Sequence, residues 1–280
     1  SISIAFARSP MSSAMLSWDL QAASDGRFTL GLGSQVKGHN QRRFSVPWSP
    51  PAPRMREYVQ SVRAIWDCWA KNVPLNYQGK HYQFSLMTPN FRPDPLKGPL
   101  PKIQIAAVGP IMMKVAAEEC DGVMLHSFCT QKYLIGSILP KIQLGLDRSG
   151  KKREEFEISG GGFVATGKNQ QDVDAMFELV RSRIGFYGST PSYWPVLEAH
   201  DLKDLGLKLN RLSKKGLWDQ MTKEVPDDVV HLFTAVGRHE ELAKAIDQRF
   251  GGIVDIVSLP ADTPGDLLQD IRVLESPGSS

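Results

Sequence analysis

Residues 103–110 read IQIAAVGP, and this stretch decides the fold class. Its apolar side chains predict a buried strand over Lys102–Ala107, and Pro110 then opens a helix that continues to Glu119. A further strand is expected at Gly122–His126, directly after this helix. Strand, helix and strand in close succession are typical of a parallel sheet that is covered by helices.

The same alternation extends in both directions from this stretch. Ser9 and Pro10 suit the N-cap and first position of a helix that ends at Gly26. Its expected apolar face consists of Met11, Ala14, Met15 and Trp18. The other expected strands are Ser1–Ala7, Phe28–Leu32, Phe156–Thr166 and Ile253–Leu259. The other expected helices are an amphipathic one with Met55, Tyr58, Val59, Val62, Ile65, Trp66 and Trp69 at helical spacing, and helices over residues 132–146, 170–186 and 240–250.

Three regions depart from the alternation. Residues 77–84 alternate around a glycine and predict a small hairpin, and the proline-rich residues 89–101 predict a loop. Residues 188–230 indicate a helical insertion, with Trp194 and Trp218 as packing anchors. The tail, residues 276–280, is expected to be disordered.

This pattern contains six strands joined by helices. A doubly wound sheet and an eight-stranded barrel both fit such alternation, and six strands are two fewer than a barrel needs. Because Ile2, Ile4 and Phe6 place the first residues inside a strand, we expect that an N-terminal segment is missing. Such a segment would account for the shortfall.

The composition excludes several classes of protein. The 280 residues carry 33 basic and 30 acidic side chains, interspersed, which is not the basic stripe of a nucleic-acid-binding protein. Cys68, Cys120 and Cys129 form no Cys-x-x-Cys motif, so a disulfide scaffold or zinc ribbon is not expected, and a cytoplasmic location is favoured. No apolar run approaches the roughly 20 residues of a membrane helix, and no signal pattern opens the chain.

The turn between the predicted strand and Pro110 has the features of an anion site. Proline at the first helical position would leave the next amides free, and the helix dipole favours negative charge there. These amides would be those of Ile111, Met112 and Met113. Small residues at positions 106, 107 and 109 would let a phosphate approach the backbone. An ordinary tight strand–helix turn is the alternative interpretation.

A second glycine-bearing strand end is Gly31-Leu32-Gly33-Ser34. Val36 stands where the third glycine of a Gly-x-Gly-x-x-Gly fingerprint belongs, so this is not a dinucleotide motif. A strand end without side chains would let a planar ring lie against the backbone, whereas a packing requirement for glycine is the alternative. A further run, Gly160–Gly162, could form an anion nest, but flexibility at a strand start is the favoured interpretation.

Together these segments resemble the luciferase-like monooxygenase family, and in particular its branch that uses the deazaflavin coenzyme F420. The segments that carry the resemblance are Phe6–Pro10, Gly26–Gly33, His39–Arg43, Arg54–Trp66, Tyr77–Phe84, Ile105–Pro110 and Asp121–His126. The resemblance implies an α/β fold: a TIM-like (β/α)8 barrel of the bacterial-luciferase type without its first two β/α units. This barrel would form one domain over residues 1–275 and would bind a small-molecule substrate. The resemblance also suggests a homodimer.

The resemblance also implies which residues hold the cofactor. The phosphate would contact Ala106, Ala107, Val108, Gly109, Pro110, Ile111 and Met112. The isoalloxazine ring would lie at Gly33 and Ser34, and a supporting backbone bulge would fall at Ser1 and Ile2.

Charged and imidazole side chains supply the remaining candidates. On the loop after the glycine strand, His39 and Arg43 are candidate substrate contacts. His39 and His126 are candidate catalytic proton donors, and His81 in the hairpin is expected to be structural. Merely solvated side chains are the alternative interpretation for this loop.

The implied function is that of an oxidoreductase that transfers a hydride between F420 and an organic substrate. An FMN-dependent monooxygenase is the alternative within the family. A hypothesis of another class is a non-catalytic barrel that binds a flavin-like ligand, or a degenerate remnant. The predicted strand ends carry no carboxylate cluster for a metal, no Schiff-base lysine and no nucleophile elbow, which suits an enzyme whose cofactor supplies the chemistry.

Overall fold

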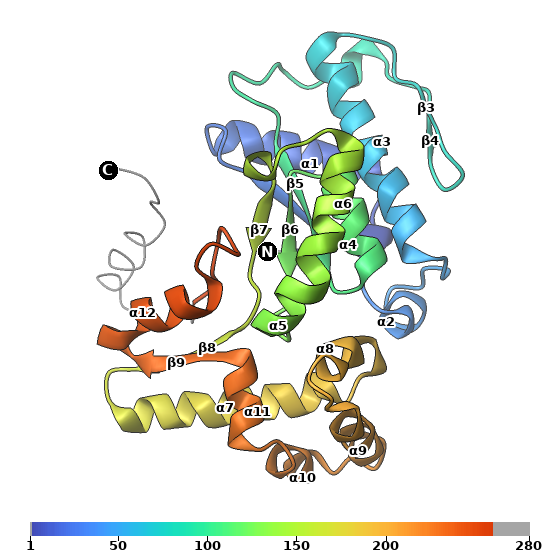
Figure 1. The fold of residues 1–280 in the computed structure, drawn as a ribbon. Helices are drawn as coiled ribbons and strands as arrows, with labels where there is room; N and C mark the ends of the chain where they lie inside the picture. Colours follow the sequence, from blue (N-terminus) through green and yellow to red (C-terminus); the bar gives the residue numbers. More distant parts are fainter. Residues whose placement is uncertain (1, 260–280) are drawn as a thin grey trace. The chain divides into compact units, whose positions relative to one another are not determined.

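The computed structural model of the chain describes residues 2–259, so Ser1 and the predicted tail 276–280 lie outside the described residues. The chain forms two compact units (Figure 1). Of the described residues, 2–124 and 141–156 form the first unit, and 125–140 and 157–259 form the second. Within residues 2–259, no helix has the length and apolar character needed to cross a membrane.

The first unit is built on parallel strands. β1 (Ser3–Ile4), β2 (Thr29–Gly33), β5 (Lys102–Ala107) and β6 (Gly122–Leu125) lie side by side in that order. β1 and β5 both run parallel to β2, with Ile4 opposite Gly33 and Leu32 opposite Ile105. The α/β class with parallel strands is therefore confirmed.

The element that decides the fold has the expected bounds. β5 leads into α4 (Pro110–Glu119) as the sequence predicts. The strand predicted at Ser1–Ala7 is shorter than expected, because residues Ala5–Ala7 tighten into a 3₁₀ turn after β1.

Two long helices, α1 (Pro10–Ala23) and α3 (Pro51–Lys71), pack against each other. The Trp18 and Trp69 rings meet edge to face with centroids 5.3 Å apart. The Tyr58 hydroxyl lies 2.6 Å from Oγ of Ser13. The apolar face predicted for α3 is confirmed, since all seven of its expected residues are buried.

The face predicted for α1 is wrong at one position. Met15 is 53% exposed, and the buried face contains Ser13, Ser17 and Gln21 instead. These polar side chains are tolerated because their groups are hydrogen-bonded. The Ser17 hydroxyl, for example, donates to the carbonyl of Ser13 at 2.6 Å.

The predicted hairpin is present as β3 (Tyr77–Gln78) and β4 (Gln83–Phe84), which pair antiparallel. It docks on α3 through Glu57, whose carboxylate accepts from the His81 amide at 2.6 Å. An ideal Cβ on Gly79 would lie 2.4 Å from this carboxylate, so the hairpin needs a glycine at its turn. The proline-rich segment is a loop apart from a 3₁₀ turn at Pro89–Phe91.

The second unit contains β7 (Glu157–Ser159), β8 (Phe163–Gly167) and β9 (Thr234–Arg238), with β8 parallel to β9. Its longest helix is α7 (Gln170–Gly188), and α12 (His239–Phe250) follows β9. The predicted insertion is helical and consists of α8 (Trp194–Glu198), α9 (Lys203–Lys214), α10 (Trp218–Lys223) and α11 (Asp227–Phe233).

The strand predicted at Phe156–Thr166 is two strands. Gly160 and Gly161 separate them with φ angles of +90° and +116°, which side chains rarely adopt. An ideal Cβ on Gly160 would lie 2.7 Å from the Leu125 carbonyl oxygen. The glycine run therefore serves backbone packing, and the Gly160 amide is taken by the carbonyl of Ile256.

The strand predicted at Ile253–Leu259 is also wrong. Only an isolated bridge between Ser159 and Ile256 forms there. The Asp255 carboxylate accepts a hydrogen bond from the Ile158 amide at 2.7 Å. In a regular strand pair, a backbone carbonyl would accept this bond. β9 takes the place beside β8, where the sequence pattern did not predict a strand.

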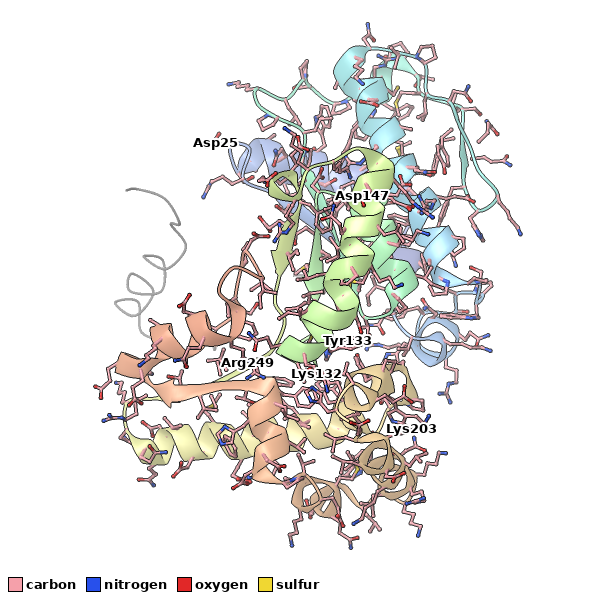
Figure 2. The ribbon with its side chains drawn as sticks, in the orientation of Figure 1. Asp25, Lys132, Tyr133, Asp147, Lys203 and Arg249 are labelled. Atoms are coloured by element: carbon pink, nitrogen blue, oxygen red, sulfur yellow. The ribbon has the colours of Figure 1, made fainter. Side chains whose placement is uncertain are left out.

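Of the two tryptophans expected to anchor the insertion, only Trp218 differs from expectation. Trp194 is partly buried, and its indole donates to the Gly188 carbonyl at 3.0 Å. Trp218, in contrast, is 53% exposed and anchors nothing in the core. Arg249 of α12 joins neighbouring elements instead, because its guanidinium donates to the carbonyls of His231 and Thr234 at the end of α11 (Figure 2).

The helix predicted over residues 132–146 spans α5 (Gln131–Tyr133), a π-helical turn (Leu134–Ile138) and α6 (Leu139–Ser149). The wide turn ends two residues before Pro140, which has no amide to donate to a regular α-helical ladder.

Candidate functional site

The predicted cofactor contacts of three segments adjoin in the first unit. Because β1, β2 and β5 run parallel, their carboxyl ends meet at one edge of the sheet, which we call the carboxyl edge. An ideal Cβ on Gly33 would lie 2.8 Å from Cγ2 of Ile2 and 3.9 Å from Cβ of Ala106. Gly33 thus lets Ile2 pack against the end of β2, because a side chain at this position would need the space that Ile2 fills.

The amino end of α4 follows the same edge. Gly109 is its N-cap and contributes no side chain, and an ideal Cβ there would meet no atom within 4 Å. The amides of Ile111 and Met112 have no hydrogen-bond partner within the described part of the chain. The expectation of a third free amide is wrong, because Met113 already donates to the Gly109 carbonyl at 3.1 Å. Two open amides at a helix start form an arrangement that suits an anion.

The loop after β2 contains a short helix that the sequence did not predict, α2 (Lys37–Arg42). His39 lies on it and Arg43 caps it, and both side chains are exposed. Asn40 is only 1% exposed and donates from Nδ2 to the carbonyl of Ser34 at 2.9 Å. Asn40 therefore fastens α2 to the carboxyl edge.

Sequence reasoning missed Asn40. An asparagine in a polar loop is normally expected to be exposed. Its contact with the Ser34 carbonyl exists only in the folded loop. Its Oδ1 atom is buried and accepts no hydrogen bond from the described residues.

His126 belongs to the second unit, where it lies in an aromatic cluster. Its ring centroid is 4.4 Å from that of Tyr187 and 4.8 Å from that of Tyr193. Burial lowers the pKa of His126 from 6.5 to about 4, so the imidazole is neutral at pH 7. Nδ1 accepts from the Phe128 amide at 3.0 Å, which places the single ring proton on Nε2. No sequence motif indicates that these two tyrosines lie beside His126.

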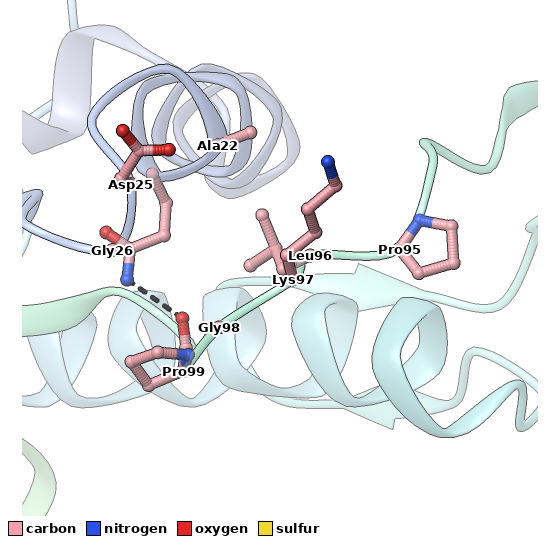
Figure 3. Close-up of a pocket in the computed structure, with 9 residues that line it drawn as sticks. Ala22, Asp25, Gly26, Pro95, Leu96, Lys97, Gly98 and Pro99 are labelled. Carbon is pink, nitrogen blue, oxygen red and sulfur yellow. Dashed lines mark hydrogen bonds between the residues drawn. The ribbon is translucent and has the colours of Figure 1, made fainter.

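A pocket of about 330 Å³ lies elsewhere in the first unit (Figure 3). It is lined by Gln21, Asp25, Gly26 and residues 95–99. Gly26 precedes β2 and Pro99 precedes β5, so this pocket adjoins the amino ends of the strands, away from the carboxyl edge. Both polar ends of the Gln21 amide are already used, by the Pro99 carbonyl and the Phe28 amide.

Charged side chains fix the far end of α4. Arg56 of α3 pairs with Glu118 and Glu119. Burial opposes ionisation, yet the Arg56 guanidinium holds the pKa of Glu118 below its usual value. The Lys151 ammonium donates to three carbonyls at the end of α4, those of Ala117, Glu118 and Cys120. The helix is thus held at its carboxyl end while its amino end stays open.

Among residues 2–259, no three histidine, cysteine or acidic side chains gather as metal ligands. The carboxyl edge presents small residues and open backbone amides.

Comparisons with known proteins place this arrangement in a family. The model of the luciferase-like monooxygenase family matches residues 1–255. The uncharacterized protein Rv1360 of Mycobacterium tuberculosis is 43% identical over 256 residues, which cover 91% of this chain and 75% of that protein. The 5,10-methylenetetrahydromethanopterin reductase of Archaeoglobus fulgidus is 28% identical over 258 residues, 89% of this chain and 72% of the relative.

Among solved structures, the coenzyme F420-dependent tetrahydromethanopterin reductase of Methanopyrus kandleri superposes with a TM-score of 0.74 at 21% identity. The alignment covers 98% of this chain and 80% of that one. At this identity the likeness shows the fold, which is that of the luciferase-like TIM barrels. In residues 2–259 the strands do not form one closed sheet of eight.

The chain belongs to the luciferase-like monooxygenase family. It is accordingly an oxidoreductase.

Proposed function

We propose that this protein transfers a hydride between coenzyme F420 and an organic substrate. The observation that carries the proposal is the carboxyl edge itself. There Gly33 and Ala106 lie side by side and the open amino end of α4 follows directly. Relatives named as a methylenetetrahydromethanopterin reductase and as a putative coenzyme F420-dependent oxidoreductase, each 28% identical, support the choice of cofactor.

The residues present fit a phosphate-bearing cofactor with a planar ring. The amides of Ile111 and Met112 would hold the phosphate, and the space above Gly109 would admit it. Gly33 and Ser34 would lie against the ring, with Ile2 beside them. When bound, the deazaflavin would supply the hydride chemistry to an organic acceptor.

The remaining groups would act on the substrate. His39 and Arg43, exposed on and beside α2, would contact it. His126 is held neutral with its proton on Nε2, so it would offer a hydrogen-bond donor rather than a charge. A neutral donor suits an uncharged oxygen of an organic substrate.

The cofactor is tested by fluorescence titration of the protein with F420 and, separately, with FMN under identical conditions. We expect F420 to bind at least tenfold more tightly, which corresponds to about 1.4 kcal/mol. Tighter binding of FMN would overturn the F420 assignment in favour of an FMN-dependent monooxygenase. FMN also has a phosphate and a planar ring, so it could bind at the same groups of the carboxyl edge. Binding of neither would contradict the proposal and support a remnant without activity.

A further inference from the structure

The segment around α2 has an unusual charge pattern. No acidic residue occurs between Asp25 and Glu57, in a chain that carries 30 acidic and 33 basic residues in all. The basic and imidazole side chains within this interval are Arg27, Lys37, His39, Arg42, Arg43, Arg54 and Arg56. The interval therefore carries positive charge without local compensation.

Three of these arginines are engaged by the protein. Arg27 donates to the Ser24 carbonyl at 2.8 Å. Arg54 donates to the Tyr82 hydroxyl at 3.0 Å. Arg56 pairs with carboxylates of α4. Their presence is explained by packing and by the stability of the first unit.

The cations of α2 have no such partners. Lys37, Arg42 and Arg43 are exposed, and none forms an ion pair with any residue in the described range 2–259. Arg43 rests over the neighbouring Phe44 ring at 5.2 Å, which leaves its guanidinium edge for another contact. A carboxylate or phosphate is the partner that such edges bind best.

Helix geometry places three of these side chains together. At about 100° per residue, His39, Arg42 and Arg43 fall within an arc of about 100° on α2. We call this surface the α2 face. Asn40 lies about 60° beyond the arc. Its side chain ties the helix to the Ser34 carbonyl, so the α2 face is held near the carboxyl edge.

A helix dipole alone gives a weaker account. Cations in a last turn are favourable with the dipole, and α9 shows this with Lys214 as its last residue and Lys215 as its C-cap. The dipole does not explain why the first turn of α2 lacks the acidic side chain that α9 has there in Asp204. The α9 pair thus provides a matched comparison.

We propose that the α2 face binds an anionic substituent of the substrate, a carboxylate or a phosphate. The identification of the ligand as the substrate rests on the proposed function, whereas binding of the anion does not require turnover. The substrate class is then an organic carbonyl or alcohol compound that carries such an anion, and it excludes wholly neutral lipids.

The test compares ligands that differ only in charge. The probes are 4-acetylbenzoate against its methyl ester, and dihydroxyacetone phosphate against dihydroxyacetone, with dissociation constants measured by ligand-observed NMR. We expect at least one anion to bind about tenfold more tightly than its neutral partner at low salt, and the preference to shrink at 0.5 M NaCl, because exposed charges are screened. The pair that shows the preference distinguishes carboxylate from phosphate.

Variants assign the effect to the α2 face. The double substitution R42Q/R43Q should abolish the preference and leave the neutral compounds unaffected. The double substitution K214Q/K215Q removes the same charge from the same two positions of another helix and should keep the preference. Equal binding of anions and neutral partners to the wild type would overturn the proposal. So would a preference that survives R42Q/R43Q or disappears equally in K214Q/K215Q.

The same variants separate this proposal from the proposed function. If R42Q/R43Q weakens F420 binding as strongly as anion binding, the cations serve the cofactor, and the assignment to the substrate is wrong. If the wild type binds neither F420 nor FMN yet shows the anion preference through Arg42 and Arg43, the cofactor proposal fails and the anion-binding α2 face stands.

Discussion

Acid should destabilise this protein through His126. The imidazole packs against the rings of Tyr187 and Tyr193, and its Nδ1 atom accepts from the Phe128 amide at 3.0 Å. Protonation would place a positive charge among these rings. It would also put an N–H group on Nδ1, which would then face the N–H group of Phe128 and could no longer accept its hydrogen bond. Burial therefore lowers the pKa of His126 to about 4.

The size of the effect follows from the difference between the two states. The unfolded chain has the ordinary value of 6.5, so the pKa of His126 falls by about 2.5 on folding, which corresponds to at most about 3.4 kcal/mol. Because the ring is partly exposed, we expect about 2 kcal/mol. The unfolded state takes up the proton first, so this stability is complete above pH 6.5 and is lost as the pH falls toward 4.

Two measurements check this expectation. An NMR titration of the imidazole C–H signals should show one of the six histidines with a midpoint near pH 4, and that signal should be missing in His126→Asn. The asparagine can still accept from the Phe128 amide. Urea unfolding at pH 7 and pH 4.5 should show a larger loss of stability in the wild type than in the variant. A His126 midpoint near 6.5, or equal losses in both proteins, would refute the reasoning.

Three further expectations concern the first unit. In Gly109→Ala the added methyl group would meet no atom within 4 Å, so the free energy of unfolding should change by less than about 1 kcal/mol. Fluorescence titration should nevertheless show F420 binding at least tenfold more weakly. In Gly98→Ala the methyl group would also meet no atom within 4 Å, and F420 binding should be unchanged. Lys151→Met removes donors to three carbonyls and should cost about 1–2 kcal/mol in urea unfolding, and an unchanged midpoint would contradict that role. Gly145→Ala would bring Cβ within 2.6 Å of the Ala117 Cβ and should cost about 1–3 kcal/mol. Thermal melting measures this cost. An unaltered melting temperature would contradict the expectation, because α4 and α6 would then be able to move apart without loss of stability.

Sequence patterns predicted those elements in which the buried residues recur at regular helical or strand spacing. The apolar face of α3 and the strand-to-helix transition at Pro110 each follow from the pattern of neighbouring residues, so both could be predicted. The misplaced elements depend on distant partners instead. Phe156–Thr166 breaks at Gly160 because the Leu125 carbonyl lies against it, and β9 exists because β8 pairs with it.

The candidate site divides in the same way. Gly33 at the end of β2 and Gly109 at the start of α4 were recognisable in the sequence as positions without a side chain. Their neighbourhood was not, because the pairing of β2 with β5 brings Ala106 beside Gly33 across more than 70 residues of chain. Burial of Asn40 likewise arises only when the loop folds back on Ser34.

The central claim is that the cofactor binds at the carboxyl edge, and amide hydrogen exchange read by mass spectrometry locates that contact directly. With saturating F420, we expect slower exchange in peptides that cover residues 31–36 and 109–113, with the Ile111 and Met112 amides protected. Peptides around the pocket of Gly26 and residues 95–99 should be unaffected. Protection at that pocket, with no change at residues 109–113, would contradict the account.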